Sequence, residues 1–497
     1  MSTQSPHLLR ILAVQSLLRD KSLAVEALED LPGELFPPVF MEAFSRGHGE
    51  VLKAMVLSWP FPYLPMGALM SMRKVETLDT QVDDGQMPER MFHAVLDGLD
   101  VLLSQKVPSR LKLQVLDMRD KQQNFWRVWA GNELEVCSEE AIKKSKGEEP
   151  GSRGAKKQPL TVILDLCLHQ QHLCPVDPYL LKWVQEREDL VQVHCQKLWV
   201  TTTCTKMVTE VLPTLNLDSV QELNVGCRWT LFTLAEFAPF LGQMCNLQKL
   251  ILSDISVPAI LSPEKTEQLF TQITSQFIKL HCLQEMYMEA VDFLEGHLDW
   301  VLRCLPFPLK TLSLTHCQLS HSDWIQLPQA EQTYWLKHLD LSYVRLTDFA
   351  PKSLQILLKN VAATLTTLHL ENCGITDEQV CAFLPSLSCC SQLTTFCFVR
   401  NFISIDIMKK LLCHTARLSN LTLEMHSIPQ EVYVPRNGLK KKARKAVNWD
   451  KLREIKQKPT ENPTAFMACL SEAFTKFTHL NPTSTEGQLV LNTSFIS

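Results

Sequence analysis

Leu365-Thr-Thr-Leu-His-Leu-Glu-Asn-Cys-Gly-Ile375 is the stretch of sequence that decides the fold. Its apolar residues follow the order Leu-x-x-Leu-x-Leu-x-x-Cys-x-Ile. The alternation at Leu368 and Leu370 predicts a short strand with one buried face, because successive side chains of a strand point to opposite faces. Cys373 then marks a turn, where a polar side chain can hydrogen-bond to the neighbouring backbone.

The same pattern recurs through the second half of the chain. Its copies start at Val220, Leu247, Leu283, Leu309, Leu336, Leu365, Leu393 and Leu418. The starts are separated by 27, 36, 26, 27, 29, 28 and 25 residues, and the one long step carries an insertion around 257–267. Such regular spacing indicates a repeat architecture rather than chance matches in a leucine-rich chain.

Each period also contains a helical stretch. Within 353–361, one helical stripe is formed by Leu354, Leu357, Leu358 and Val361. A period near 28 residues fits one strand and one helix per repeat, and no single repeat can bury its apolar face alone. Residues 161–436 therefore predict an α/β leucine-rich-repeat solenoid, a horseshoe with parallel strands along its concave face. That face is the expected binding site of a substrate protein, which the sequence does not identify.

A mostly helical region, 1–130, is expected before the clear repeats. Asp20 can cap a helix whose stripe includes Leu23 and Leu28, and Pro32 ends that helix. A first, irregular repeat strand is expected at Leu113, Leu116 and Met118. Residues 131–160 have few apolar side chains, which predicts a flexible surface loop.

Composition limits the class of protein. Hydrophobic residues make up 45% of the 497, enough for a sizeable core. The net charge of -5 argues against direct nucleic-acid binding over the whole protein. Arg10 and Arg19 interrupt the apolar start, so no signal peptide is expected, and no apolar run is long enough to span a membrane. We therefore expect a cytoplasmic or nuclear protein with reduced cysteines.

No motif of a catalytic, cofactor or metal site is present. The sequence has no Gly-rich phosphate loop, Gly-x-Ser-x-Gly elbow or His-Glu-x-x-His, so we expect neither an enzyme nor a bound cofactor. Residue types that bind zinc occur at Cys167, His169, His172 and Cys174. Their spacing matches no structural zinc pattern, so no metal site is predicted.

Short motifs leave two further alternatives open. The basic residues Lys440, Lys441, Lys442, Arg444 and Lys445 form either a nuclear import signal or a solvated linker. Leu-x-x-Leu-Leu, a nuclear-receptor contact, occurs at 99–103 and 354–358. Both copies lie on stripes that the core requires, which favours burial over receptor binding.

From about Gln15 to Gly438 the chain resembles the melanoma-antigen (PRAME) family. The stretches that carry the resemblance are Gln15-Ser-Leu-Leu, Leu31-Pro-Gly-Glu-Leu-Phe-Pro-Pro38, Leu96-Asp-Gly-Leu-Asp-Val-Leu-Leu103, Leu241-Gly-Gln-Met244, Cys373-Gly-Ile-Thr-Asp377 and Ser391-Gln-Leu-Thr-Thr395. The resemblance implies a leucine-rich-repeat horseshoe and a substrate receptor of a cullin-RING ubiquitin ligase. It also implies modulation of transcription, proliferation, differentiation and apoptosis. The alternative function is a transcriptional repressor or co-regulator that binds nuclear receptors or chromatin proteins.

A ligase receptor of this kind carries two short boxes. The first, which binds elongin C, resembles the residues Ser22, Leu23, Ala27 and Leu31. The second, which contacts a cullin, resembles the residues Leu31, Pro32, Leu35 and Val39. Two alternatives remain: these leucines cap the first repeat, or the opening at Leu31 resembles an F-box and binds a different adaptor.

The tail, 437–497, is expected to be a basic linker followed by a truncated, partly disordered helical segment. It resembles a gammaretroviral Gag capsid fragment at Gln457-Lys-Pro-Thr-Glu461, Phe466, Leu470, Glu472-Ala-Phe474, Phe477-Thr478, Pro482 and Ser494-Phe-Ile496. Lys458 replaces the usual glycine, and the chain stops before the remaining capsid helices. The resemblance therefore does not imply capsid assembly.

Overall fold

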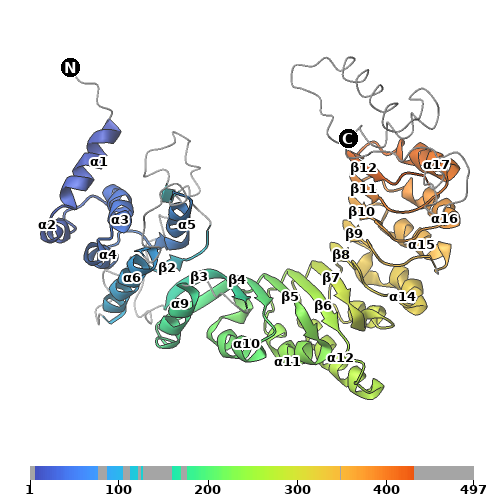
Figure 1. Cartoon of the computed structure of the whole chain (residues 1–497), viewed down its shortest axis with the longest axis horizontal. Coiled ribbons are helices and arrows are strands. Elements are labelled where there is room, and N and C mark those ends of the chain that lie inside the picture. Colours follow the sequence, from blue (N-terminus) through green and yellow to red (C-terminus); the bar gives the residue numbers. More distant parts are fainter. Residues whose placement is uncertain are drawn as a thin grey trace, which may run out of the picture. The chain divides into compact units, whose positions relative to one another are not determined.

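The structure is a computed structural model that describes residues 6–76, 87–104, 112–120, 125–126, 159–169, 176–347 and 349–429 (Figure 1). The chain forms two compact units, Met1–Asn224 and Val225–Ser497. Both are α/β, with parallel strands in chain order and helices between them. No helix in the described ranges is long and apolar enough to cross a membrane.

The first unit begins with helices, as expected. They are α1 (Pro6–Leu17), α2 (Lys21–Glu26), α3 (Phe36–Ser45), α4 (Gly49–Leu57), α5 (Met66–Glu76) and α6 (Met87–Ser104), with a 3-10 turn at Gly33–Leu35. Asp20 caps α2, because its side chain accepts hydrogen bonds from the backbone N–H groups of Ser22 and Leu23. Gly98 allows α6 to approach α4 closely, since a Cβ at this position would lie 2.9 Å from the Lys53 carbonyl oxygen.

The strands of this unit start earlier than predicted. They are β1 (Tyr63–Pro65), β2 (Val115–Asp117), β3 (Leu160–His169) and β4 (Val191–Thr201), with α9 (Val176–Gln185) and α10 (Thr205–Val211). The irregular repeat strand expected at Leu113–Met118 is β2, but it is not the first. A proline-rich stretch forms β1, which pairs with β2 from Tyr63 to Pro65. An outermost strand needs few backbone donors, so it tolerates proline. Apart from its last two residues, the loop predicted at 131–160 lies outside the described residues.

The second unit contains the predicted repeats. Strand β5 (Glu222–Thr230) crosses the boundary, and it is followed by β6 (Lys249–Ser256), β7 (Glu285–Val291), β8 (Thr311–Ser313), β9 (His338–Asp340), β10 (Thr367–His369), β11 (Thr395–Phe398) and β12 (Leu423–His426). Strands β5 to β11 each begin two residues after a predicted repeat start. Leu368 and Leu370 are fully buried, which confirms the predicted strand phase.

Helices cover one face of this sheet (Figure 1). They are α11 (Leu231–Leu241), α12 (Pro263–Phe277), α13 (Leu298–Arg303), α14 (His321–Gln326), α15 (Pro351–Val361), α16 (Asp377–Leu387) and α17 (Ile405–Thr415). The predicted stripe on α15 is buried along its whole length, from Leu354 to Val361. The fold is thus an α/β leucine-rich-repeat solenoid.

The last repeat differs from its predicted register. Thr395 of β11 pairs with Leu423 of β12, so Leu421, and not Leu418, occupies the start of the repeat. Glu424 and His426 then fill the positions that Phe396 and Phe398 fill one repeat earlier. Leu418 misled the pattern because it is itself buried, in the turn after α17.

Candidate interaction surfaces

The second unit has a sheet face that its helices leave uncovered, and we call it the open face. Along β6 to β11 its side chains alternate with buried apolar side chains that face the helices. Thr367 and His369 of β10 lie on it, on either side of buried Leu368, as the predicted strand phase requires. Equivalent positions on neighbouring strands form rows across the sheet.

One row contains an ion pair between adjacent strands. His369 of β10 and Asp340 of β9 are cross-strand partners, with Nδ1 of His369 3.6 Å from Oδ2 of Asp340. The hydrogen bond to Asp340 raises the pKa of His369, although burial opposes the rise. Burial would raise the pKa of Asp340, but hydrogen bonds from His369 and Ser342 outweigh it and hold that pKa below its usual value.

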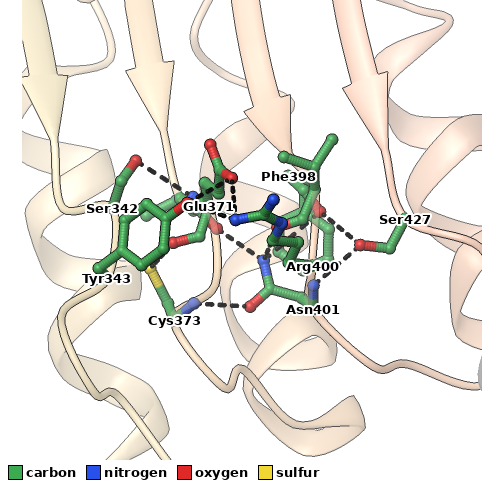
Figure 2. A network of polar contacts seen from close by, with 10 residues as sticks. Ser342, Tyr343, Glu371, Cys373, Phe398, Arg400, Asn401 and Ser427 are labelled. Carbon is green, nitrogen blue, oxygen red and sulfur yellow. Dashed lines mark hydrogen bonds and ion pairs between the residues drawn. The ribbon is translucent and has the colours of Figure 1, made fainter.

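A second cluster lies just beyond the ends of these strands (Figure 2). The Tyr343 hydroxyl donates a 2.8 Å hydrogen bond to Glu371, and Arg400 donates a 2.6 Å hydrogen bond to that hydroxyl. Arg400 also lies 3.3 Å from Glu371 as an ion pair. The ring of Tyr343 stacks on His316, with ring centroids 4.1 Å apart. Four successive repeats thus present one fixed set of polar and aromatic groups.

One residue in each of these repeats has a left-handed backbone conformation. His316, Tyr343, Asn372 and Arg400 have φ values of 57°, 65°, 52° and 61°, each seven residues after its repeat start. A positive φ is unfavourable for most residues, so its recurrence marks a turn that the repeat imposes. The turn directs one side chain per repeat to the rim of the open face.

The polar position of the repeat pattern holds these turns together. Asn401 is fully buried, and its Oδ1 accepts hydrogen bonds from the backbone N–H groups of Cys373 (3.1 Å) and Ile375 (3.2 Å) (Figure 2). Its Nδ2 donates a 2.6 Å hydrogen bond to the Leu370 carbonyl. The Cys373 thiol likewise donates to the Leu341 carbonyl at 3.1 Å. The predicted bonding of this position to neighbouring backbone is confirmed.

The expected adaptor box begins on α2 in the first unit, but the helix does not extend through the whole box. Leu23 is 53% exposed, whereas Ala24 and Leu28 are buried. However, α2 ends at Glu26, so Ala27 is its C-cap and Leu31 lies beyond it. The expectation that Leu23, Ala27 and Leu31 share one continuous helical stripe is therefore wrong. Ser22 is exposed, while Ala27 and Leu31 are half-buried.

The cullin-contacting box is only partly accessible. Pro32 is exposed, and Leu35 is half-buried in the 3-10 turn before α3. Val39 is 1% exposed, because it lies on the inner face of α3 among the apolar side chains of this unit. Val39 is thus a core residue, and the expectation that it contacts a cullin is not compatible with this fold.

Both Leu-x-x-Leu-Leu motifs are buried, as predicted. Leu99, Leu102 and Leu103 lie on the inner face of α6, and the second motif lies on that of α15. The basic run 440–445 lies outside the described residues. So do His172 and Cys174, and no group of three or more potential metal ligands occurs in the described part of the chain.

A charged row in the first unit was not anticipated from the sequence. Asp117 is fully buried at the end of β2, where it accepts a hydrogen bond from the Tyr63 hydroxyl. It also accepts two hydrogen bonds from the Arg119 guanidinium, at 2.6 and 2.9 Å. Burial and the bond to Asp117 both raise the pKa of Tyr63. Arg119 also donates to Gln196 of β4 at 2.5 Å. An aspartate inside an otherwise apolar strand pattern was the signal that could have revealed this row.

Comparisons with known proteins cover almost the whole chain. The PRAME N-terminal domain model matches residues 5–126, and the PRAME C-terminal domain model matches residues 160–479. The chain is 49% identical to human PRAME family member 20, over 87% of this chain and 88% of that protein. It is 47% identical to human PRAME family member 12, over 88% of each chain. Among solved structures, an internalin from Listeria monocytogenes has 14% identity and a TM-score of 0.26, over 48% of this chain and 72% of its own.

The comparisons also bear on the tail. The C-terminal family model continues to residue 479, beyond Asn437, where the sequence patterns predicted that the family resemblance would end. The expected Gag-capsid resemblance of 437–497 finds no support in these matches. All of that segment lies outside the described residues. Two family models and extensive identity to several of its members show that the chain belongs to the PRAME family.

Proposed function

We propose that this protein is a substrate receptor of an elongin/cullin-RING ubiquitin ligase, working in the cytoplasm or the nucleus. Family membership and the leucine-rich-repeat fold suggest a protein-interaction scaffold, and such scaffolds are typically not enzymes. A receptor needs two surfaces: one for the adaptor and one for the substrate. The first unit supplies a candidate for the adaptor, and the open face of the second unit supplies a candidate for the substrate.

The exposure of Leu23 carries the adaptor assignment. A leucine that merely completed the first unit's core would be buried, as Ala24 and Leu28 are. Leu23 instead presents 53% of its surface to solvent on a helix fixed by the Asp20 cap. A helix that presents an apolar anchor to a groove is a common mode of peptide recognition. The interpretation that these residues only cap the repeats is therefore disfavoured.

The rest of the proposed contact does not lie on one helical stripe, because α2 ends at Glu26. Leu31 follows a turn, so it approaches an adaptor from a loop rather than from the same helical stripe. Pro32 and Leu35 are the accessible residues of the second box, and Val39 supports them from the core. We propose that cullin recruitment depends on Pro32 and Leu35.

The open face suits a folded or extended substrate protein. Its polar groups are already paired with one another, as in His369 with Asp340 and Arg400 with Glu371, which limits the ordering required on binding. The expected effects on proliferation, apoptosis, differentiation and transcription depend on which protein is bound.

Copurification from cells tests this function. Wild-type protein should carry elongin C and a cullin, and Leu23→Asp should lose both, because a charge would be desolvated in an apolar pocket. Pro32→Ala should keep elongin C and weaken the cullin. If the wild type associates with neither partner, the receptor function is excluded.

The alternative function is a transcriptional co-regulator without ligase activity. It would share the open face but could not use either Leu-x-x-Leu-Leu motif, because those leucines are buried. Transcriptional repression that persists in Leu23→Asp, in cells where wild type binds no elongin C, would favour this alternative.

A further inference from the structure

Large apolar side chains are exposed along one edge of the second unit, where strands β7, β8 and β9 begin. Ile278, Phe307, Tyr334 and Trp335 are 60%, 53%, 40% and 64% exposed. They precede three consecutive parallel strands, so they lie along the edge of the sheet where the strands begin. The turns that carry Tyr343 and Arg400 lie at the other edge, where the strands end. Isolated exposed apolar residues are normal, but an aromatic set on successive repeats marks a binding site. We call these four residues, together with Lys310 and Lys337, the rim patch.

The loops that carry these side chains are tied to one another. The Leu309 backbone N–H donates a 2.8 Å hydrogen bond to the Gln332 carbonyl, and the Gln332 side chain donates to the Leu305 carbonyl at 3.3 Å. Phe307 also contacts the ring of His281 from the preceding repeat, with centroids 6.4 Å apart. The aromatic groups are therefore presented on fixed backbone, which reduces the entropy lost on binding.

Two exposed lysines follow the aromatic residues closely in the chain, Lys310 after Phe307 and Lys337 after Trp335. Lys310 and Lys337 are directly adjacent across β8 and β9, because the Lys337 N–H donates a 2.8 Å hydrogen bond to the Lys310 carbonyl. No ion pair joins either lysine to a carboxylate within the part of the chain that the structure describes, nor does one involve the nearby Glu331. Like charges directly opposite each other repel, so this arrangement favours an added anion.

At the position that follows the repeat start, a lysine occurs only in the two repeats that Phe307 and Trp335 precede. The equivalent position is Gln284 in the preceding repeat and Thr366 in the next, and both backbones pair in the same way. Thr394 follows in the repeat after that. Positive charge and exposed aromatic surface therefore coincide in the same two repeats, although neither feature requires the other.

We propose that the rim patch binds an acidic segment of a partner protein that also carries large apolar side chains. The partner's carboxylates would pair with Lys310 and Lys337, and its apolar side chains would pack on Trp335 and Phe307. Two lysines neutralise too few phosphates to hold a nucleic acid on a chain of net charge -5. The rim patch shares no residue with α2 or with the pairs described on the open face, so the proposal does not depend on ligase function.

Fluorescence anisotropy with labelled peptides tests the proposal. The probes are short peptides of Asp and Glu with Trp, Phe or Leu at varied spacings, and matched peptides with Lys in place of every acid. Full-length protein should bind acidic apolar peptides, less tightly as salt is raised, and should not bind the lysine set. Trp335→Ala, and separately Lys310→Glu with Lys337→Glu, should each weaken binding at least about tenfold.

A matched control separates the rim patch from general surface effects. Lys352→Glu with Ile356→Ala changes an exposed lysine and a 46% exposed isoleucine on α15, and it should leave binding unchanged. Equal weakening by this control, equal binding of the lysine peptides, or binding by none of the acidic peptides overturns the proposal. So does a rim-dependent dimer in sedimentation, or tighter binding of a single-stranded oligonucleotide than of any acidic peptide.

Discussion

Asn401 accepts a hydrogen bond from the backbone N–H of Cys373 at 3.1 Å, so a side chain of one repeat fixes the turn of the repeat before it. The thiol of Cys373 donates to the Leu341 carbonyl of the repeat before that, just as Nδ2 of Asn401 donates to the Leu370 carbonyl. This chain of contacts between repeats holds the turns that carry Tyr343 and Arg400. The order of the side chains beside the open face therefore depends on the hydrogen bonds of these buried polar residues.

Replacing Asn401 should destabilise the solenoid more than replacing Cys373. Asn401→Ala leaves the N–H groups of Cys373 and Ile375 and the Leu370 carbonyl without their partner, at a cost on the order of 3 kcal/mol. Cys373→Ala removes one weak donor and a small apolar volume, and should cost about 1–2 kcal/mol. Urea denaturation followed by circular dichroism measures both. Equal losses would show that the amide does not hold the turns.

The strand phase gives a sharper pair of variants. Leu368→Ala removes a fully buried side chain from β10 and should cost about 2–5 kcal/mol. Its neighbour Thr367 lies on the open face, so Thr367→Ala should change the free energy of unfolding by less than about 0.5 kcal/mol. Similar losses of melting temperature in the two variants would contradict the strand phase.

The ion pair between His369 and Asp340 predicts a pH-dependent contribution to stability. The pKa of His369 is raised above its usual 6.5, so the contribution is fully present below pH 6.5 and is lost as the pH rises through the folded-state pKa. The pKa of Asp340 is held below its usual 3.8, so the contribution is present above pH 3.8 and is lost as the pH falls through that lower value.

A double-mutant cycle with His369→Asn and Asp340→Asn isolates this contribution. Because the pair is partly exposed, the coupling should be about 0.5 kcal/mol at about pH 5.5 and smaller at about pH 8.5. Urea midpoints at the two pH values measure it. A coupling that grows with pH would contradict the assigned shifts.

Cysteine reactivity should follow burial. Burial raises the pKa of Cys373 and of Cys390 to about 12, so almost no thiolate is present at neutral pH. Cys381 and Cys413 are exposed on α16 and α17. Native protein treated with iodoacetamide at about pH 7.5 should be alkylated at Cys381 and Cys413 before Cys373 and Cys390, as read by peptide mass spectrometry. Alkylation of Cys373 as fast as that of Cys381 would show that its repeat opens readily.

Periodicity predicted the solenoid because every repeat has the same sequence pattern of buried and exposed positions. It failed where a local pattern competed with long-range contacts. Leu418 matched the repeat start, but pairing with β11 placed Leu421 there. The sequence patterns predicted no strand in the proline-rich stretch 59–65, although an outermost strand accepts part of it as β1.

The candidate site was predictable only in part, for related reasons. Spacing selected Leu23 as a candidate adaptor contact, but it could not show that α2 ends at Glu26 or that Val39 packs inward. The contacts of Tyr343 with Glu371 and Arg400 join residues of three different repeats, which no local pattern reveals. The rim patch likewise joins two repeats, since Lys310 and Lys337 become neighbours only through the pairing of β8 with β9.

The receptor assignment makes one claim above all: that exposed Leu23 anchors an adaptor. Isothermal titration of purified protein with elongin C tests it, with Val25→Asp as the control, because Val25 is 40% exposed on the same helix but outside the box pattern. Wild type and Val25→Asp should bind, and Leu23→Asp should bind about a hundredfold more weakly or not at all. No binding by the wild type, or equal binding by Leu23→Asp, would contradict it.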